Sequence, residues 1–449
     1  MWGGYAMSDK LTRTTFRTSR LLDFLSEKEL VAQTGHAVAD WPLVVLKELV
    51  DNALDACEDA GVRPEIGITV DNSGIAVSDN GPGIPKETVE GVLDFGIRVS
   101  NREAYVAPDR GAQGNALKTV VAVPFVLDGS TGAVEIAAGG LTHRVQVEVD
   151  RIQQKPVVEH EETPVDGSKG TTVRLVWPDS ACSILEAARD RFLQLAEDFT
   201  WLNPHLSLDV DWFGEGIQIP ATGVGWRKWT PGDPTSPHWY TPEHLGRLVS
   251  AYLAHDEERG KNRTVREFVA EFRGLSGTAK QKAVLDATGL SRTNLSALMN
   301  GRGLDAKALA RLLAAMKERS KPVPPKALGV IGRDHLAARF EAIGSEMESF
   351  DYKKMSGETD GLPWVVETAF AWCPQAERRR IVTGVNWSPG IINPFRQLGK
   401  AGRSLDTILA QQRATADEPL VLVLHMACPR VAYTDRGKSA VVIPGGEED

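Results

Sequence analysis

One run of nine residues, Glu48-Leu-Val-Asp-Asn-Ala-Leu-Asp-Ala56, constrains the fold of this chain more than any other. On a helix, Glu48, Asn52 and Asp55 lie at positions i, i+4 and i+7, so their side chains line one face. The residues between them are mostly apolar, which makes the helix amphipathic, and its polar stripe cannot be the side that packs against a core. The spacing therefore predicts a helix over residues 42–60 whose two carboxylates and one amide point into a cleft.

A second stretch, Asp79-Asn-Gly-Pro-Gly83, follows a strand-like run over residues 75–78. At the end of a strand, the carboxylate of Asp79 can accept a hydrogen bond from an adenine amino group. Gly81 and Gly83 let the backbone turn and approach a ligand closely. Because an Asp-x-Gly-x-Gly stretch alone is more often an ordinary turn, its meaning depends on the elements around it.

A third stretch, Arg110-Gly-Ala-Gln-Gly114, opens a helix-like run. Gly111 and Gly114 leave amide donors exposed at a helix start, where the helix dipole favours phosphate. Taken singly, a Gly-x-x-Gly stretch is weak evidence and an acidic helix face is usually a solvated surface. The three stretches occur in order within 120 residues, and Gly170-Thr-Thr172 then precedes a strand-like run. Order and spacing therefore favour a nucleotide site over the structural readings.

Together these stretches resemble the nucleotide-binding boxes of the GHKL ATPases, the superfamily of gyrase-type topoisomerases, heat-shock chaperones, mismatch-repair ATPases and sensor histidine kinases. The resemblance implies ATP and Mg²⁺ as ligands, with Glu48 as the catalytic base and Asn52 as the magnesium ligand, roles that suit a carboxylate and an amide oxygen. We expect Asp55 to hold helix and loop together instead of touching the nucleotide. The implied nucleotide-binding residues are Asn52, Asp79, Gly81, Gly83, Gly111, Gln113, Gly114, Asn115, Lys118 and Thr172.

The order of patterns along the chain predicts an arm and three domains. Residues 1–35 form a polar, basic arm of the kind that exchanges between subunits, and residues 36–225 alternate helices with strands. Within the latter we expect strands at 66–79 paired through a turn, and helices at 86–94 and 183–199. Short helices follow in residues 226–335, after a linker rich in Trp, Gly and Pro. Residues 336–449 carry strands at 364–372, 381–387 and 420–426 and a helix at 403–412.

Residues 283–301 have the pattern of a helix, a tight turn at Gly289 and a second helix capped by Ser291. In a DNA-binding helix-turn-helix, residues 291–294 would meet bases and phosphates. The same pattern also fits a plain helical bundle in which Ser291 only caps a helix. The sequence supports these two readings equally.

The middle and last regions resemble one group within this superfamily, the topoisomerase VI B subunits. The features that carry this resemblance are Pro324-Pro325, Ile331-Gly332, a strand with His425 and a Gly437-Lys438 loop. The resemblance implies an α+β chain: a GHKL (Bergerat) ATPase sandwich, a helical helix-two-turns-helix-like insert, and a transducer domain of ribosomal-protein-S5-like α/β fold. Lys438 would be the switch lysine that reaches the γ-phosphate, a second catalytic residue. The implied partners are DNA, a topoisomerase VI A-like DNA-cleaving subunit and, on binding ATP, a second copy of the chain.

The chain departs from that family in two places. Its phosphate loop reads Gly-Ala-Gln-Gly-Asn-Ala-Leu-Lys118 where the family usually has Gly-Gln-Gln-Gly-Ile-Gly, so Ala116 replaces a glycine and Lys118 adds charge near the phosphates. The family's B subunit also continues past the switch loop into a helix that docks on the A-type partner. Because this chain stops at Asp449, we expect that docking element to be missing. No DNA-cleaving domain is recognisable.

Composition limits the partners and the compartment. With 51 Lys and Arg against 60 Asp and Glu, the net charge is −9, so any contact with DNA must be local. Four widely spaced cysteines imply no zinc site and suit a reducing cytoplasm. No run approaches the length that spans a membrane, so we expect a soluble, cytoplasmic protein without a membrane partner.

Two other functions remain to be weighed against a topoisomerase-type ATPase. One is a nucleotide-gated clamp on DNA or protein, such as a defence-type GHKL ATPase, without strand passage. The other, a histidine kinase, is disfavoured because Glu48 occupies the place of a base that activates water, whereas a kinase transfers the phosphoryl group to a histidine.

Overall fold

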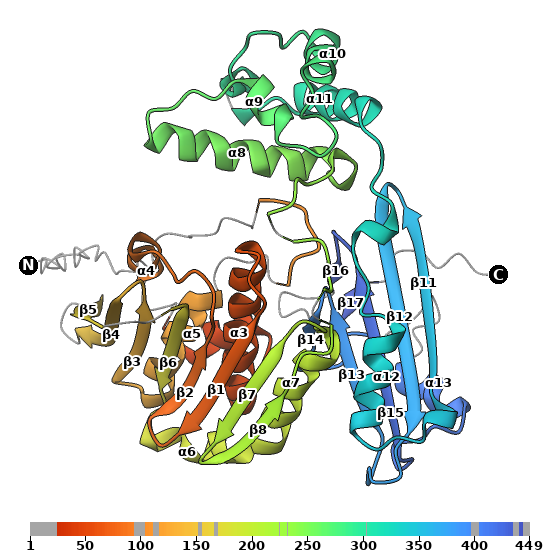
Figure 1. Cartoon of the computed structure of the whole chain (residues 1–449). Coiled ribbons are helices and arrows are strands. Elements are labelled where there is room, and N and C mark those ends of the chain that lie inside the picture. Colours follow the sequence, from red (N-terminus) through yellow and green to blue (C-terminus); the bar gives the residue numbers. More distant parts are fainter. Residues whose placement is uncertain are drawn as a thin grey trace, which may run out of the picture.

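The computed structural model describes residues 25–93, 104–110, 116–150, 155–165, 169–223, 225–230, 232–301, 303–396, 404–433 and 440–442. They form an amino-terminal sheet covered by helices, a helical region above it, and a second sheet beside it (Figure 1). Among these residues, no helix combines the length and apolar character needed to cross a membrane.

The amino-terminal sheet has eight strands in the order β5-β4-β3-β6-β2-β1-β7-β8, and only β1 and β7 are parallel. Residues on β1 alternate in burial, with Ile66, Ile68 and Val70 facing the core. The strands are β1 (Glu65–Asp71), β2 (Gly74–Ser78), β3 (Thr131–Ala138), β4 (Leu141–Asp150), β5 (Lys155–Pro164), β6 (Thr171–Val176), β7 (Ser207–Trp212) and β8 (Glu215–Ile219).

Helices cover one face of this sheet, and the core lies between the two layers (Figure 1). Helix α3 packs against α5, α7 and β2, so it lies in the middle of the helical layer. The helices are α2 (Glu27–Thr34), α3 (Trp41–Asp59), α4 (Lys86–Leu93), α5 (Ala116–Asp128), α6 (Cys182–Ala187) and α7 (Arg189–Leu202), with short 3₁₀ turns η1 (Val38–Asp40) and η2 (Asp179–Ala181).

The local predictions for this region are confirmed with one change. The helix expected over residues 42–60 is α3, the paired strands are β1 and β2, and the helix at 86–94 is α4. The single helix expected over 183–199 is instead two, α6 and α7, divided at Ala188, which caps the end of one and the start of the other.

The helical region is a small bundle (Figure 1), and its apolar core is continuous with apolar residues of the second sheet. Helix α11 packs against α8 and α10, and α10 against α9. Its helices are α8 (Pro242–Glu258), α9 (Val265–Ala270), α10 (Thr278–Thr288) and α11 (Ala306–Arg319). Its shorter elements are η3 (Pro237–Trp239), η4 (Leu295–Leu298), η5 (Pro325–Ala327), β9 (Met299–Asn300) and β10 (Gly303–Leu304).

The second helix that both readings of residues 283–301 expected is absent. Helix α10 ends as predicted at Gly289, which has φ +72°. Ser291 does not cap a helix, because its hydroxyl donates to Asp286 Oδ1 (2.8 Å), and Arg292 has φ +63°. Only the 3₁₀ turn η4 follows, so residues 291–294 present no recognition helix.

The second sheet has five strands in the order β11-β12-β15-β13-β14, with β13 and β15 parallel. The strands and the helix predicted from the sequence are confirmed here. The elements are α12 (Arg333–Ala342), η6 (Met347–Ser349), β11 (Asp351–Thr359), β12 (Leu362–Trp372), β13 (Arg380–Val385), β14 (Ser388–Pro389), α13 (Leu405–Gln411), β15 (Leu420–Ala427), β16 (Ala432–Tyr433) and β17 (Val441–Val442).

The helical region joins the rest of the chain through two adjacent segments, residues 226–229 and 328–331, which we call the neck. Trp229 N donates to the carbonyl of Leu328 (3.0 Å), and a Cβ on Gly329 would lie 2.8 Å from the Cα of Lys228. The fully buried Glu367 of β12 accepts the N–H groups of Ile331 (2.7 Å) and Gly332 (2.9 Å). The neck is thereby fixed to the second sheet.

Candidate nucleotide-binding site

Helix α3 presents the predicted polar face. Apolar residues of the helix such as Leu49 and Leu54 are buried in the core, which turns Glu48 and Asn52 outward. Glu48 is half-buried, whereas Asn52 is exposed and its side-chain amide makes no hydrogen bond with any described residue. A free amide oxygen one turn from a carboxylate fits the donor set expected for Mg²⁺ and for activating water.

Asp79 lies where β2 ends, between the loop that follows it and the start of β6. Its Oδ1 accepts the N–H groups of Gly81 (2.8 Å) and Thr171 (3.2 Å). Burial raises the pKa of Asp79, and these two backbone donors act against that rise. The carboxylate is therefore held in a fixed orientation and keeps acceptor capacity for a ligand amino group.

Glycines bring three segments together at this point. A Cβ on Gly170 (φ +78°) would lie 1.8 Å from the carbonyl oxygen of Asp79, so the β6 start can approach only without a side chain. A Cβ on Gly81 would lie 3.4 Å from Cys57 Sγ of α3, and one on Gly83 (φ +85°) 3.3 Å from the carbonyl of Gly170. The predicted residues Asp79, Gly81 and Gly83 thus lie together beside the start of β6, and Gly81 also approaches α3.

Thr172, which the sequence analysis assigned to nucleotide binding, follows directly after the residue of β6 that contacts Asp79. Its partner in the sheet is Ser78, whereas the carbonyl of Thr171 accepts the N–H of Asp79 (2.9 Å) and the N–H of Thr171 donates to Asp79 Oδ1. Thr171 is buried, and its N–H reaches the Asp79 carboxylate directly. Thr171 is therefore the residue of the Gly-Thr-Thr stretch that contacts Asp79, which the sequence pattern did not distinguish from Thr172.

Asp55 holds helix and loop together, as expected. Its Oδ1 accepts from Arg110 Nη1 (2.7 Å), the residue directly before the glycine-rich stretch 111–115. The guanidinium of Arg110 has no exposed surface and also binds Glu58 Oε1 (2.6 Å) and Asn203 Oδ1 (2.6 Å). Three charge-assisted contacts thus anchor the start of the predicted phosphate loop to α3, and a fourth anchors it to Asn203 at the end of α7.

A second cation completes this buried cluster. Lys228 Nζ lies 2.7 Å from Glu58 Oε2, and His205 Nε2 lies 3.0 Å from Glu58 Oε1. Burial alone would raise the pKa of Glu58, but Arg110 and Lys228 lower it well below its usual range. Burial also lowers the pKa of Lys228 and of His205. Asp55 and Glu58 balance two cations, so the cluster can stay ionised inside the protein.

The hairpin between β13 and β14 connects this buried cluster to the second sheet through hydrogen bonds. Asn386 (φ +51°) and Trp387 (φ +64°) form its two-residue turn. Asn386 Nδ2 donates to the carbonyl of Asp109 (3.3 Å), and Asn203 Nδ2 donates to the carbonyl of Trp387 (2.9 Å). Because Asn203 also binds Arg110, the tip of the hairpin and the start of the loop share one partner.

A further contact links the same hairpin to α3. Ser388 Oγ donates to Asp51 Oδ2 (2.7 Å), which also accepts from Lys47 Nζ (2.7 Å), and Lys47 bonds the Ser388 hydroxyl. Asp51 lies between Glu48 and Asn52 in the sequence of α3, on the turn of the helix that carries both. These hydrogen bonds therefore couple a displacement of α3 to the second sheet.

The remaining predicted residues lie at or beyond the edge of the described chain. Lys118 is in the first turn of α5 and is 2% exposed, so its ammonium is inside the protein. Gly111, Gln113, Gly114, Asn115 and Lys438 lie outside the described residues, as do Arg13, Arg17 and Arg20 of the arm. Their roles stay predictions.

A pocket of about 400 Å³ lies elsewhere, between the end of α3, residues 105–109 and the helical region. Asp59, Tyr105, Thr235 and Phe272 are among its lining residues, and none of the predicted nucleotide residues is. It adjoins the buried cluster through Asp109 but is separate from the site at Asp79.

The sequence analysis assigned no role to Arg110, Glu58, Lys228 or Asn203. Their contacts join positions 52 to 170 residues apart, and local spacing carries no signal for such pairs. Arg110 alone offered a hint, since an arginine directly precedes the glycine-rich stretch.

Comparison with known proteins agrees with this geometry. The histidine kinase-, DNA gyrase B-, and HSP90-like ATPase family matches residues 37–181, which include α3, the Asp79 loop and β6. The B subunit of type 2 DNA topoisomerase 6 from Archaeoglobus fulgidus is 25% identical over 420 residues, 89% of this chain and 66% of that protein. The protein of the same name from Pyrococcus abyssi is 23% identical over 451 residues, 88% of this chain and 77% of that protein.

Solved structures that resemble this chain have lower sequence identity to it than the relatives above. The B subunit of DNA gyrase from Myxococcus xanthus has a TM-score of 0.41 at 15% identity, covering 95% of this chain and 90% of its own. The ATPase region of Saccharomyces cerevisiae topoisomerase II has a TM-score of 0.40 at 12% identity, covering 89% and 77%. This chain spans about two thirds of the length of the Archaeoglobus relative. On the family match, the chain carries a GHKL ATPase domain over residues 37–181, and most of its length is similar in sequence to the topoisomerase VI B subunits.

Proposed function

We propose that this chain is an ATP-dependent, dimerising ATPase that drives DNA strand passage together with a DNA-cleaving subunit of the topoisomerase VI A type. In the ATP site, Asp79 accepts the adenine amino group, and Glu48 orients water and takes its proton. Asn52 would hold Mg²⁺, which neutralises charge on the phosphates when bound. The stretch 111–115 supplies backbone donors to the phosphates, and Lys438 supplies a positive charge to the γ-phosphate.

The observation that carries this proposal is the double attachment of the ATP site to the second sheet. One attachment runs from α3 through Asp51 to Ser388, and the other from Arg110 through Asn203 to the Trp387 carbonyl. A kinase that only transfers a phosphoryl group needs no such link. A motor that converts loop ordering into domain movement does, because coupling needs a contiguous set of packed and hydrogen-bonded groups.

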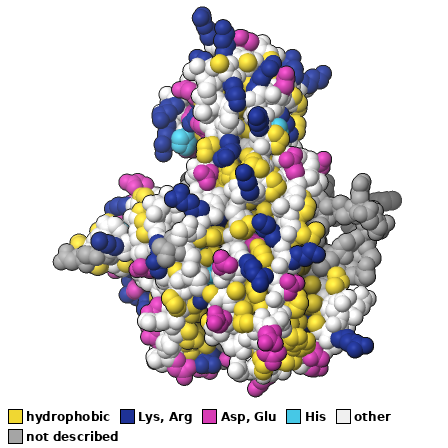
Figure 2. Space-filling view, turned by 45° about the vertical axis from the view of Figure 1, so that its right-hand side comes forward, with side chains coloured by type: hydrophobic (Ala, Val, Ile, Leu, Met, Phe, Trp, Pro, Cys, Tyr) yellow, Lys and Arg dark blue, Asp and Glu magenta, His cyan; other side chains and the backbone are white. Residues whose placement is uncertain are grey.

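Local charge supports DNA as a partner. Residues 241–320 contain 14 Lys and Arg against 9 Asp and Glu, although the whole chain has an acidic excess. Figure 2 shows Lys and Arg side chains spread over the helical region at the top of the molecule. A basic surface of this kind binds phosphate backbones without a recognition helix, in keeping with the absence of one at residues 291–294.

The decisive experiment is a supercoil relaxation assay. The purified chain, a topoisomerase VI A-like protein from the same organism, ATP and Mg²⁺ are incubated with negatively supercoiled plasmid. Relaxation that needs both proteins and ATP, and that is lost with Glu48→Ala, supports strand passage.

The same assay separates the proposal from a nucleotide-gated clamp. ATP-dependent retention of closed circular DNA without relaxation, at any ratio of the two proteins, would exclude strand passage and leave the clamp. Absence of ATP hydrolysis by the chain would exclude both functions.

A further inference from the structure

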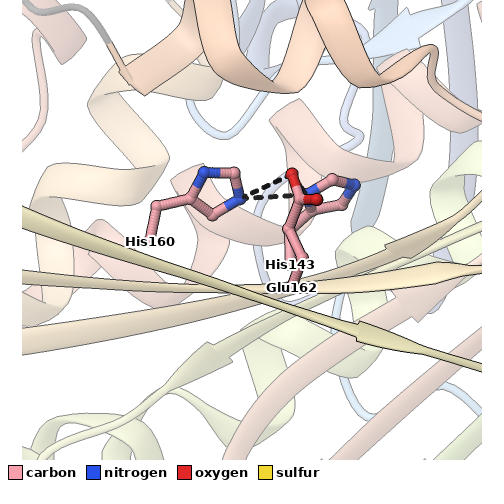
Figure 3. A group of neighbouring side chains, drawn as sticks. All are labelled: His143, His160 and Glu162. Atoms are coloured by element: carbon pink, nitrogen blue, oxygen red, sulfur yellow. Dashed lines mark hydrogen bonds and ion pairs between the residues drawn. The ribbon is translucent and has the colours of Figure 1, made fainter.

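Three side chains on the two strands at one end of the first sheet form a cluster outside the ATP site. His143 lies on β4 opposite Glu162 of β5, and His160 lies opposite Val145, two residues along. Because side chains alternate between the faces of a strand, all three share one face. Figure 3 shows the two imidazoles and the carboxylate turned toward one another.

The three nearest atoms have the spacing of ligands around a metal ion. His143 Nδ1 lies 2.9 Å from His160 Nε2 and 3.6 Å from Glu162 Oε1, and His160 Nε2 lies 3.8 Å from the same oxygen. The centre of this triangle is about 2.0 Å from each corner, which is the usual Zn–N and Zn–O bond length. An ion can therefore occupy the centre with little movement of the side chains.

The surroundings favour a ligand set that is ready to bind. His143 is 1% exposed, so the protein holds its imidazole in a fixed place on the inner side of the cluster. His160 and Glu162 are 21% and 29% exposed, so an ion can enter from solvent. Lys86 Nζ of α4 binds the other oxygen, Oε2, of Glu162 (2.7 Å), which orients Oε1 toward the histidines.

We propose that His143, His160 and Glu162 bind one divalent transition-metal ion of the zinc class, with the fourth position left to solvent. Two imidazoles and one carboxylate select such an ion over Mg²⁺, which prefers oxygen ligands. None of the four cysteines takes part, which is why cysteine spacing gave no sign of the site. The proposal is independent of ATP binding.

The position of the cluster indicates what the ion does. Strand β5 lies at the edge of the sheet, and within the described part of the chain it pairs with β4 alone. The ion joins β5 to β4, and Lys86 extends the link to α4, the helix that follows the Asp79–Gly83 stretch. We therefore assign it a structural role, to hold the sheet edge and the start of α4 in register.

The test uses the full chain without an affinity tag, freed of metal by a chelator. Titration with Co²⁺ should give visible absorption that saturates at one ion per chain, and Zn²⁺ should abolish it while excess Mg²⁺ should not. Zn²⁺ should also raise the thermal midpoint. The variants His160→Ala and Glu162→Gln should each lower the affinity for Co²⁺ by at least about tenfold.

The matched control is Glu161→Gln, an exposed carboxylate on the opposite face of β5, which should bind Co²⁺ as the unchanged chain does. Both ligand variants alter partly exposed side chains, so folding is checked by circular dichroism. Absence of stoichiometric Co²⁺ binding would mean that the cluster is only a hydrogen-bonded pair of imidazoles. Binding that is unaffected by His160→Ala and Glu162→Gln would likewise overturn the proposal.

Discussion

Arg110 is a buried arginine that makes four charge-assisted hydrogen bonds. Its guanidinium is fully buried between Asp55, Glu58 and Asn203, and a second cation, Lys228, shares Glu58. A buried ion pair adds little over an apolar pair of the same shape, but removing one partner leaves the others charged and unsatisfied. At the residue scale, the cluster therefore fixes the position of the loop start.

Replacing Arg110 by Met tests this conclusion. We expect the variant to lose about 3–5 kcal/mol of stability, because Asp55 and Glu58 stay buried with too little positive charge. Differential scanning calorimetry of the full chain measures the loss as a fall in the thermal midpoint. The control is Arg189→Met, which breaks an exposed pair with Glu215 and should leave the midpoint unchanged. Equal midpoints for the two variants would refute a structural role for the cluster.

Glu48 and Asp79 should fail in different ways. Glu48→Ala should bind ATP with nearly unchanged affinity and hydrolyse it on the order of a hundredfold more slowly, because only the base is lost. Asp79→Asn should weaken ATP binding itself, since an amide can turn a donor toward the adenine amino group. Nucleotide titration and phosphate release separate the two effects. Normal turnover by a folded Glu48→Ala protein would reject the role of Glu48.

At the scale of elements, the sequence predicted what local patterns control. Helix α3 and the pair β1–β2 follow from periodicity and a turn signal, and the segments lie within a residue or two of their predicted bounds. The capping signal at Ser291 misled because its hydroxyl bonds Asp286 instead, and Arg292 takes a left-handed conformation. The hairpin at Asn386–Trp387 could not be predicted as a contact, since its partners are 184 and 277 residues away.

The approach of β6 to the Asp79 loop gives a prediction for Gly170. Gly170→Ala should destabilise the protein by about 1–3 kcal/mol more than Gly129→Ala, because a methyl group there would overlap the Asp79 carbonyl. Both glycines have φ +78°, but a Cβ on Gly129 meets nothing within 4 Å. Thermal midpoints of the two variants isolate the effect of close approach from that of backbone conformation. If the two shifts are equal, the tight contact at Asp79 is not a constraint.

The joint between α7 and α12 should respond to acid. The neutral His335 on α12 donates from Nε2 to the carbonyl of Trp201 (3.0 Å) and accepts at Nδ1 from the Thr222 hydroxyl. Burial lowers the pKa of His335 from 6.5 to about 4. Between these values the unfolded chain binds the proton more readily, so the stabilisation present above pH 6.5 is lost as the pH falls toward 4.

The variant His335→Gln checks this sign. Its thermal midpoint should fall less steeply between pH 6.5 and pH 4 than that of the unchanged chain. The corresponding difference in the free energy of unfolding is up to about 1.4 kcal/mol per pH unit. At pH 8 the variant should be the less stable of the two, since it loses the paired contacts. Parallel pH profiles would show that His335 is not the titrating group.

At the scale of the whole molecule, ATP is expected to control assembly. Helix α2, in the last part of the predicted arm, packs on α5, the helix that begins directly after the stretch 111–115. If the γ-phosphate orders that stretch, the arm gains a fixed surface across a second copy. A non-hydrolysable ATP analogue should therefore convert monomer to dimer, and ADP should not.

Light scattering measures the molar mass with analogue, with ADP and without nucleotide. Deletion of residues 1–25 should prevent the shift to dimer without changing nucleotide affinity. A mass that is the same in all three conditions would contradict ATP-driven closure, though not ATP binding.

The neck also has an evolutionary consequence. Residues 226–229 and 328–331 enter and leave the helical region side by side, and Glu367 fixes the exit segment to the second sheet independently of the bundle above. A segment whose two ends meet at one point can be exchanged, shortened or replaced without rethreading the rest of the chain. Proteins that share the two sheets can thus differ in the region inserted at the neck. They can then differ in the partner that this region binds, while the ATPase domain stays the same.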